Sequence, residues 1–354
     1  MLASELLPAI YDPQKYDVDL SRSEVPNIRL AFEMACTEAR SFIDLLRDGA
    51  DVQLGLLRFA FETFQECEDQ GMGYRSLSLA EVLSARRSLQ WLFGIFLNFA
   101  YRAYWRHERP DCYLRFVEWA KRAPGWPVVV TTNWDFVLDT LISASYGLDI
   151  IDCGDCEPSL DVFLTRYVAH GSPTGKAISL YKLNGSLDWL YCPSEKGYFS
   201  PLFQPPWNMG ALTITQTLRL KFHNPDEPIP NELRPGYCVN CGTPLEVRLH
   251  TPGASRARLP MEPRIKQNVL AAVRNCCELV FAGFSCPDED RDVVEEIGAS
   301  LRINPLFKSG DLIPTVIDIA GPHGQDTKNR FERALATRIE YRDIGFKAWV
   351  DSLT

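Results

Sequence analysis

The sequence lacks the features that mark membrane and secreted proteins. No stretch reaches the roughly 18 uninterrupted apolar residues that a membrane-spanning helix requires. The opening segment, MLASELLPAIYD, contains neither a basic start nor a long apolar core, so no signal peptide is expected. Internal repeats and low-complexity tracts are also absent. These absences predict a cytoplasmic protein that makes no membrane contact.

The sequence also lacks an excess of positive charge. Lys and Arg together number 37 against 46 Asp and Glu, which gives a net charge of −9. This balance argues against a nucleic-acid partner, because phosphate backbones are bound by clustered basic side chains. The 11 cysteines, without a secretion signal, are expected to be reduced thiols or metal ligands. With 354 residues, the chain is long enough for one large domain with an insertion, or for two domains.

Residues 1–125 are predicted to be a helical region. Ser78 and Glu81 have the spacing of a capping box, in which each side chain bonds the other residue's backbone N–H at the start of a helix. Apolar residues at helical spacing predict helices over about 28–46, 52–67, 78–107 and 111–122.

Residues 126–354 change to alternating strands and helices, with an insertion at 190–262 that contains many prolines and cysteines. This alternation predicts an α/β fold with a mostly parallel sheet and helices on both faces. Strands are expected at 127–131, 178–183, 279–284, 314–320 and 338–344, and helices at 134–146, 264–276, 288–302, 325–336 and 345–353. Because the carboxyl ends of parallel strands lie along one edge, the strand tips should converge on a single crevice.

Small polar residues end the first of these strands. VVVTTNWD, residues 128–135, runs from three valines into Thr131, Thr132, Asn133 and Asp135. Asn133 could simply cap the following helix. A helix start at this position also offers backbone N–H groups to an anionic ligand.

Two later stretches have a similar character, YKLNGSLDWLYCP at 181–193 and FAGFSCPDED at 281–290. Taken in order, the three stretches resemble the sirtuin-like domain family. That family shows a TTN-x-D strand tip, then K-L-H-G-S followed by Trp, then G-[YF]-S-x-P-x-x-D. The resemblance covers roughly residues 126–354. It implies a Rossmann-like fold that binds NAD and cleaves the bond between nicotinamide and ribose.

The resemblance also implies roles for individual residues. Asn133 matches the family's catalytic asparagine, which would orient the ribose or the attacking water, and Asp135 matches the neighbouring aspartate. Gly283 and Ser285 match residues on the adenosine side. The other residues expected to line the crevice are Thr131, Thr132, Gly185 and Ser186.

Two departures from the family pattern bear on activity. Asn184 stands where the family has its catalytic histidine, and an amide cannot take a proton at neutral pH. His170 could replace that histidine, but it precedes a strand instead of ending one. The family's glycine-rich phosphate loop would stand just before residues 2–7, and no other glycine-rich strand-to-helix turn occurs. Either the chain starts upstream of Met1, or NAD is bound in another way.

Three functions therefore stay open. The first is NAD hydrolysis, which many prokaryotic sirtuin-like proteins perform as effectors of antiphage defence. The second is a catalytically inactive relative that binds NAD, ADP-ribose or a protein partner. The third, lysine deacylation, also needs the missing histidine and ranks last. The sequence does not decide whether the chain forms a homo-oligomer or joins a defence-system partner.

The cysteines suggest structural zinc. Cys238 and Cys241 form a C-x-x-C pair followed by glycine, which directs two thiolates at one ion. Relatives pair this motif with C-P-x-C, and here Cys192 is the retained half of that site. Another pair, at 153 and 156, could complete a four-thiolate site or be ordinary loop thiols.

Overall fold

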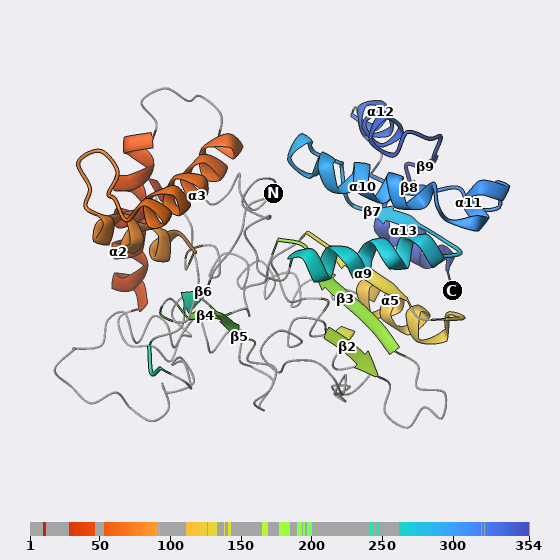
Figure 1. Cartoon of the computed structure of the whole chain (residues 1–354), viewed down its shortest axis with the longest axis horizontal. Helices are drawn as coiled ribbons and strands as arrows, with labels where there is room; N and C mark the ends of the chain where they lie inside the picture. Colours follow the sequence, from red (N-terminus) through yellow and green to blue (C-terminus); the bar gives the residue numbers. More distant parts are fainter. Residues whose placement is uncertain are drawn as a thin grey trace.

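The computed structural model (Figure 1) describes most of the predicted helices and strands. The segments that the structure describes are residues 10–11, 28–46, 53–90, 92, 111–125, 127–132, 138, 141–142, 165–168, 177–184, 190–192, 194, 197–199, 241–243, 246–247, 262–319, 321 and 323–353. Among the helices in these segments, none has the length and apolar content needed to cross a membrane.

The N-terminal helices lie close to their predicted positions. They are α2 (Ile28–Leu46), α3 (Gln53–Gln70) and a helix over 79–90. The rings of Phe42 and Phe64 stack between α2 and α3, with centroids 4.2 Å apart. The capping box is confirmed, since the Glu81 backbone N–H donates to the Ser78 hydroxyl at 3.4 Å and the Ser78 backbone N–H donates to the Glu81 carboxylate at 2.8 Å. The Ser78 hydroxyl also donates to this carboxylate, at 2.7 Å. These bonds lower the pKa of Glu81.

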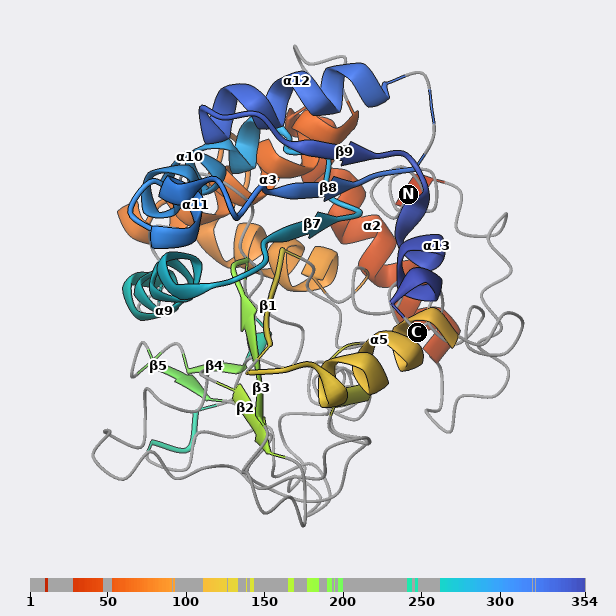
Figure 2. The same ribbon diagram turned by 90° about the vertical axis from the view of Figure 1, so that its right-hand side faces the viewer.

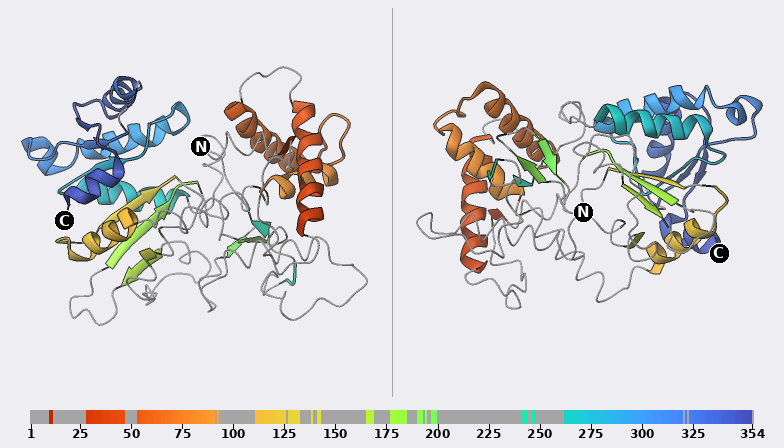
Figure 3. Two further views of the ribbon diagram at one scale, coloured as in Figure 1. Left: turned by 180° about the vertical axis from the view of Figure 1, so that it is seen from behind. Right: turned by 60° about the horizontal axis from the view of Figure 1, so that its bottom comes forward.

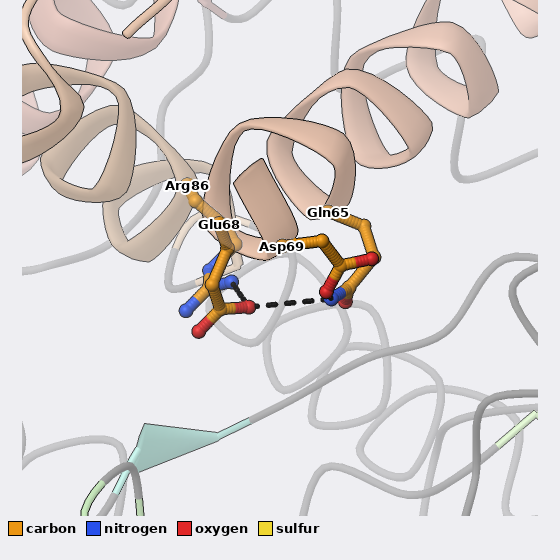
Figure 4. A network of polar contacts seen from close by, with 4 residues as sticks. All are labelled: Gln65, Glu68, Asp69 and Arg86. Atoms are coloured by element: carbon orange, nitrogen blue, oxygen red, sulfur yellow. Dashed lines mark hydrogen bonds and ion pairs between the residues drawn. The ribbon is translucent and has the colours of Figure 1, made fainter. Parts of the chain in front are cut away.

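Buried polar contacts join these helices. Arg86 is 4% exposed, and its Nη1 lies 2.9 Å from Glu68 Oε2 on α3 (Figure 4). Glu38 on α2 accepts hydrogen bonds from Ser84 and Ser88, at 3.1 and 2.5 Å. Removing one partner of a buried ion pair strongly destabilises the fold, because the other charge stays buried without a partner. The helix over 79–90 is therefore tied to both α2 and α3.

The C-terminal segment forms a parallel sheet in the order β7-β8-β9 (Figure 2). Its strands are β7 (Val280–Ala282), β8 (Thr315–Ile317) and β9 (Glu340–Arg342). Its helices are α10 (Arg291–Leu301), α12 (Gly324–Leu335) and α13 (Gly345–Ser352). Alternate side chains face opposite sides: Val316 packs with the α10 and α12 residues Leu301 and Phe331, and Ile317 packs with Trp349 of α13. The sheet is thus covered on both faces, as the alternation predicted.

A second sheet has the order β1-β3-β2, with β1 and β3 parallel. Its strands are β1 (Val128–Thr131), β2 (Thr165–Val168) and β3 (Ala177–Lys182). Strand β2 pairs antiparallel to β3 and was not predicted. Helix α5 (Asp111–Arg122) packs on one face through Ile178 and Leu180. Helix α9 (Glu262–Asn275) contacts β1 and β3, and Leu183 lines a small cavity with its residues Ile265 and Val269.

The two sheets share their helical cover. Phe116 of α5 packs both with the core under β3 and with the core under β8. Helix α9 packs against α10 as well as against β1 and β3, and Figure 3 shows α9 alongside both sheets. The described strands nevertheless form separate three-stranded sheets, so the single mostly parallel sheet that we predicted is not seen among them. At a coarse level the fold is α/β.

The insertion contains a third, antiparallel sheet in the order β5-β4-β6. Its strands are β4 (Leu190–Cys192), β5 (Gly197–Phe199) and β6 (Glu246–Val247). Two other features were not expected. The predicted helix 288–302 begins as a 3-10 turn, η5 (Asp288–Asp290), and a short helix, α11 (Pro305–Ser309), precedes β8.

Candidate functional site

The tips of β1 and β3 are joined by hydrogen bonds. Parallel pairing places Thr131 opposite Lys182, and the ladder continues where the Leu183 N–H donates to the Thr131 carbonyl at 2.9 Å. One residue further, the Asn184 side chain donates from Nδ2 to the Thr132 carbonyl at 3.1 Å. Two of the three stretches that carry the family resemblance therefore meet at one strand edge, as the sequence predicted.

Asn184 is held inside the protein at this junction. It is 2% exposed, and its amide nitrogen acts as a donor to Thr132. A side-chain amide has no group that titrates near neutral pH. The arrangement can therefore fix the relative position of the two strand tips, but Asn184 itself cannot accept a proton as the family histidine would.

Several predicted site residues fall outside the described segments. They are Asn133, Asp135, Gly185, Ser186 and the alternative base His170. Of the crevice residues, the structure places Thr131, Thr132 and Asn184 together at the β1–β3 edge.

Gly283 and Ser285 lie in a loop after β7, at the carboxyl end of that strand. The Gly283 N–H donates to the Ile317 carbonyl at 3.0 Å, which keeps the loop beside the end of β8. Gly283 has φ +63° and Cys286 has φ +51°, both in the left-handed region. A Cβ atom at position 283 would meet no atom of the described segments within 4 Å, so the backbone conformation, and not lack of space, favours glycine there.

Asp318, which was not predicted as a site residue, directly follows β8. Its Oδ1 accepts the Ile319 N–H at 2.8 Å, and its Oδ2 accepts the Tyr341 hydroxyl at 3.1 Å. Burial, together with this hydrogen bond, raises the pKa of Tyr341 to about 12, so the phenol stays protonated and donating at neutral pH. An acidic residue after a strand of an α/β sheet is a common acceptor for ribose hydroxyls. The signal in the sequence is the Asp of TVIDIAG, which lies inside the predicted strand 314–320.

Two other titratable residues, His323 and Asp290, stand at the starts of helices near this edge. His323 begins α12 with its side chain 84% exposed, 4.0 Å from Asp326, as expected of a solvent-facing turn. Asp290 is buried at 3% exposure and stands at the N-cap of α10, but its side chain makes no capping hydrogen bond.

The cysteine loops of the insertion lie near each other. Strand β4, which ends at Cys192, pairs with β6. Ser194 Oγ and Thr243 Oγ1 are 2.8 Å apart, and the exposed Cys241 thiol donates to Thr243 Oγ1 at 3.2 Å. Cys238 lies outside the described residues. Within the segments that the structure describes, no three His, Cys, Asp or Glu side chains cluster as metal ligands.

The two adjacent cysteines after α9 differ in burial. Cys276 packs against the core of α10 and α12, and burial raises the pKa of its thiol to about 11. Cys277 is exposed, because the chain leaves the helix at this point.

No protein-family model matches the sequence, and no curated protein matches it significantly.

Proposed function

We propose that the protein binds NAD along the carboxyl edges of β1, β3, β7 and β8 and hydrolyses its nicotinamide–ribose bond. The observation that carries the proposal is the Asn184–Thr132 hydrogen bond. It joins two stretches, 52 residues apart, that the family resemblance assigns to one site. The parallel strands and two-sided helical cover support a Rossmann-like arrangement, in which ligands bind at the carboxyl ends of the strands.

Within this proposal the two sheet edges hold different halves of the dinucleotide. Thr131, Thr132 and Asn184 would lie at the nicotinamide ribose. The β7 loop would receive the adenosine half, with Gly283 allowing close backbone approach. The Asp318 carboxylate keeps acceptor capacity beyond its two hydrogen bonds, since each oxygen can accept two, and would accept from a ribose hydroxyl.

The proposed reaction consumes water. Asn133 would hold the ribose and the attacking water, with Asp135 beside it. Water adds to the ribose carbon as the bond between this carbon and the nicotinamide nitrogen breaks. The products are nicotinamide, ADP-ribose and one proton. Asn184 would position the strand tips without taking that proton. Depletion of NAD in this way fits an antiphage-defence effector, which is the setting that the family resemblance implies.

The second candidate is binding without turnover, and the burial of Asn184 favours it. A 2% exposed amide that donates to the backbone supplies no general base, and the loss of a base typically lowers a rate about 10²- to 10⁴-fold. The same crevice would then hold NAD or ADP-ribose as a signal, or seat a protein partner.

Nicotinamide release from NAD tests the proposed reaction. We expect the wild-type chain to release nicotinamide, and Asn133→Ala to lower the rate about 10²-fold or more, because a positioned polar group at the reacting centre is lost. Asn329→Ala, on the outer surface of α12, should leave the rate unchanged. If wild type at high concentration releases no nicotinamide but binds ADP-ribose, the binding function replaces the enzymatic one. If it does neither, both functions are wrong.

We also propose that Cys192, Cys238 and Cys241 hold a structural zinc ion. The Ser194–Thr243 contact supports this, since it places the segment after Cys192 beside Cys241, and thiolates are the ligands of structural zinc sites.

Metal analysis tests the zinc site. Purified wild type should contain about one zinc ion per chain, as a closed thiolate site would. Cys241→Ser should lose most of it and unfold at a lower temperature. Cys277→Ser removes another exposed thiol and should keep the metal. Wild-type zinc far below that ratio after gentle purification would contradict the proposal.

A further inference from the structure

The loop after β7, residues 283–286, has an unusual backbone that must be held in place. It contains two left-handed residues, Gly283 and Cys286. The second is not glycine, and a non-glycine residue in this region is strained. The Cys286 side chain is 2% exposed and packs in the core of α10 and α12. The loop is therefore anchored at its start by β8 and at its end by the core.

Arg330 of α12 anchors the middle of this loop. Its Nε–H donates to the Ser285 carbonyl at 3.1 Å, and its Nη2 donates to the Thr327 hydroxyl at 3.2 Å. Thr327 lies one turn earlier on the same helix and is 2% exposed. The guanidinium is thus fixed to its own helix on one side and to the loop on the other.

The charge of Arg330 acts on the same loop. Burial raises the pKa of the Cys286 thiol to about 11, and the positive charge of Arg330 opposes that rise. Arg330 forms no ion pair within the part of the chain that the structure describes. Its fixed orientation therefore comes from neutral acceptors, and one of these is the backbone of the loop itself.

We propose that Arg330 is a positioning residue for nucleotide binding, because its hydrogen bonds to Ser285 and Thr327 hold loop 283–286 in the shape that receives the adenosine half. This inference rests on the proposed function of the crevice. It adds a residue from α12 to a site otherwise built from strand tips and the loops that follow them.

Arginine is suited to this role and lysine is not. The planar guanidinium donates in two fixed directions at once, whereas an ammonium group on a flexible stem does not keep this geometry. Arg330→Lys should therefore restore only part of what Arg330→Gln loses. Thr327→Val removes the second anchor with little change of shape. Added to Arg330→Gln, it should cause no further loss, since residues of one hydrogen-bonded unit are not additive.

ADP-ribose affinity, measured by calorimetry, tests the inference. We expect Arg330→Gln to weaken binding about tenfold, the effect of losing one hydrogen-bonded anchor. If the chain is active, the KM for NAD should rise about tenfold with kcat unchanged, because the adenosine side is remote from the bond that breaks. Arg333→Gln is the matched control: this arginine, also on α12, is exposed, and within the described segments its side chain donates only to the Asn329 carbonyl of its own helix.

Amide hydrogen exchange separates failure of the inference from failure of the proposed function. Faster exchange over residues 283–286 in Arg330→Gln, and not in Arg333→Gln, would show without any ligand that Arg330 orders the loop. If wild type binds ADP-ribose and Arg330→Gln binds it within twofold as tightly, the inference is wrong while the proposed function stands. If wild type binds neither NAD nor ADP-ribose, the proposed function is wrong, and with it the role of Arg330 in binding.

Discussion

Replacing Asn304 by alanine should lower the free energy of unfolding by roughly 2–4 kcal/mol, a large fraction of the roughly 5–15 kcal/mol typical of a whole domain. Asn304 is 1% exposed and stands at the junction of α9, α10 and α11. Its Nδ2 donates to the carbonyls of Val273 and Cys276, both at 2.9 Å. Its Oδ1 accepts the backbone N–H groups of Leu306 and Phe307, at 2.8 and 3.4 Å.

Alanine would remove both sets of bonds in a site where water does not replace them. The N–H groups at the start of α11 would lose their cap, and the Cys276 carbonyl at the end of α9 would lose the asparagine donor. Asn304→Asp separates these effects, because it keeps the cap oxygen but turns a second oxygen toward two carbonyls. It should destabilise the chain nearly as much.

Denaturant unfolding gives the measurement. Asn275→Ala is the control. Asn275 is exposed, and among the residues that the structure describes its side chain donates only to the Ala271 carbonyl one turn earlier. Its substitution should change stability by less than about 0.5 kcal/mol. If Asn304→Ala and Asn275→Ala lower the free energy of unfolding by similar amounts, then the hydrogen bonds of Asn304 do not stabilise this junction as proposed.

The sequence predicted regular elements well where local physics decides them. The capping box at Ser78 and Glu81 formed as expected, because its bonds lie within four residues. The parallel pairing of β7, β8 and β9 followed from long helices between short apolar strands. The start of α11 was not predicted, although Asn304 followed by Pro305 combines an N-cap with a favoured first helical residue.

Long-range pairing was harder to predict. Strand β2, TRYV, is short and half polar, and only its pairing with β3 makes it a strand. The apolar residues after β8 also led to a wrong strand boundary. The predicted strand reaches residue 320, but β8 ends at Ile317, and Ile319 is 74% exposed. That extension hid Asp318 inside a strand. A residue can contact a ligand in this way only if the strand ends before it. The end of a strand is set by backbone hydrogen bonding, which the composition of the sequence does not reveal.

The second large effect is expected from restoring a base at the β3 tip. If the crevice binds NAD as proposed, Asn184→His should raise nicotinamide release about 10²- to 10⁴-fold, the usual contribution of a positioned general base. The geometry favours this substitution because Asn184 already donates to the Thr132 carbonyl. An imidazole N–H can make the same bond, which leaves its second nitrogen as the acceptor.

The pH profile identifies the source of any gain. A histidine base works only when neutral, so the rate of Asn184→His should rise with pH through the imidazole pKa and then level off. Burial disfavours the charged imidazole and would move this midpoint below the ordinary value of about 6.5. The wild-type rate should show no such rise from this position, since an amide does not titrate. Asn184→Gln, which changes size without adding a base, should gain nothing. If Asn184→His folds, binds ADP-ribose and still releases nicotinamide no faster than wild type, then the histidine is not what the crevice lacks, and binding without turnover becomes the better description of this site.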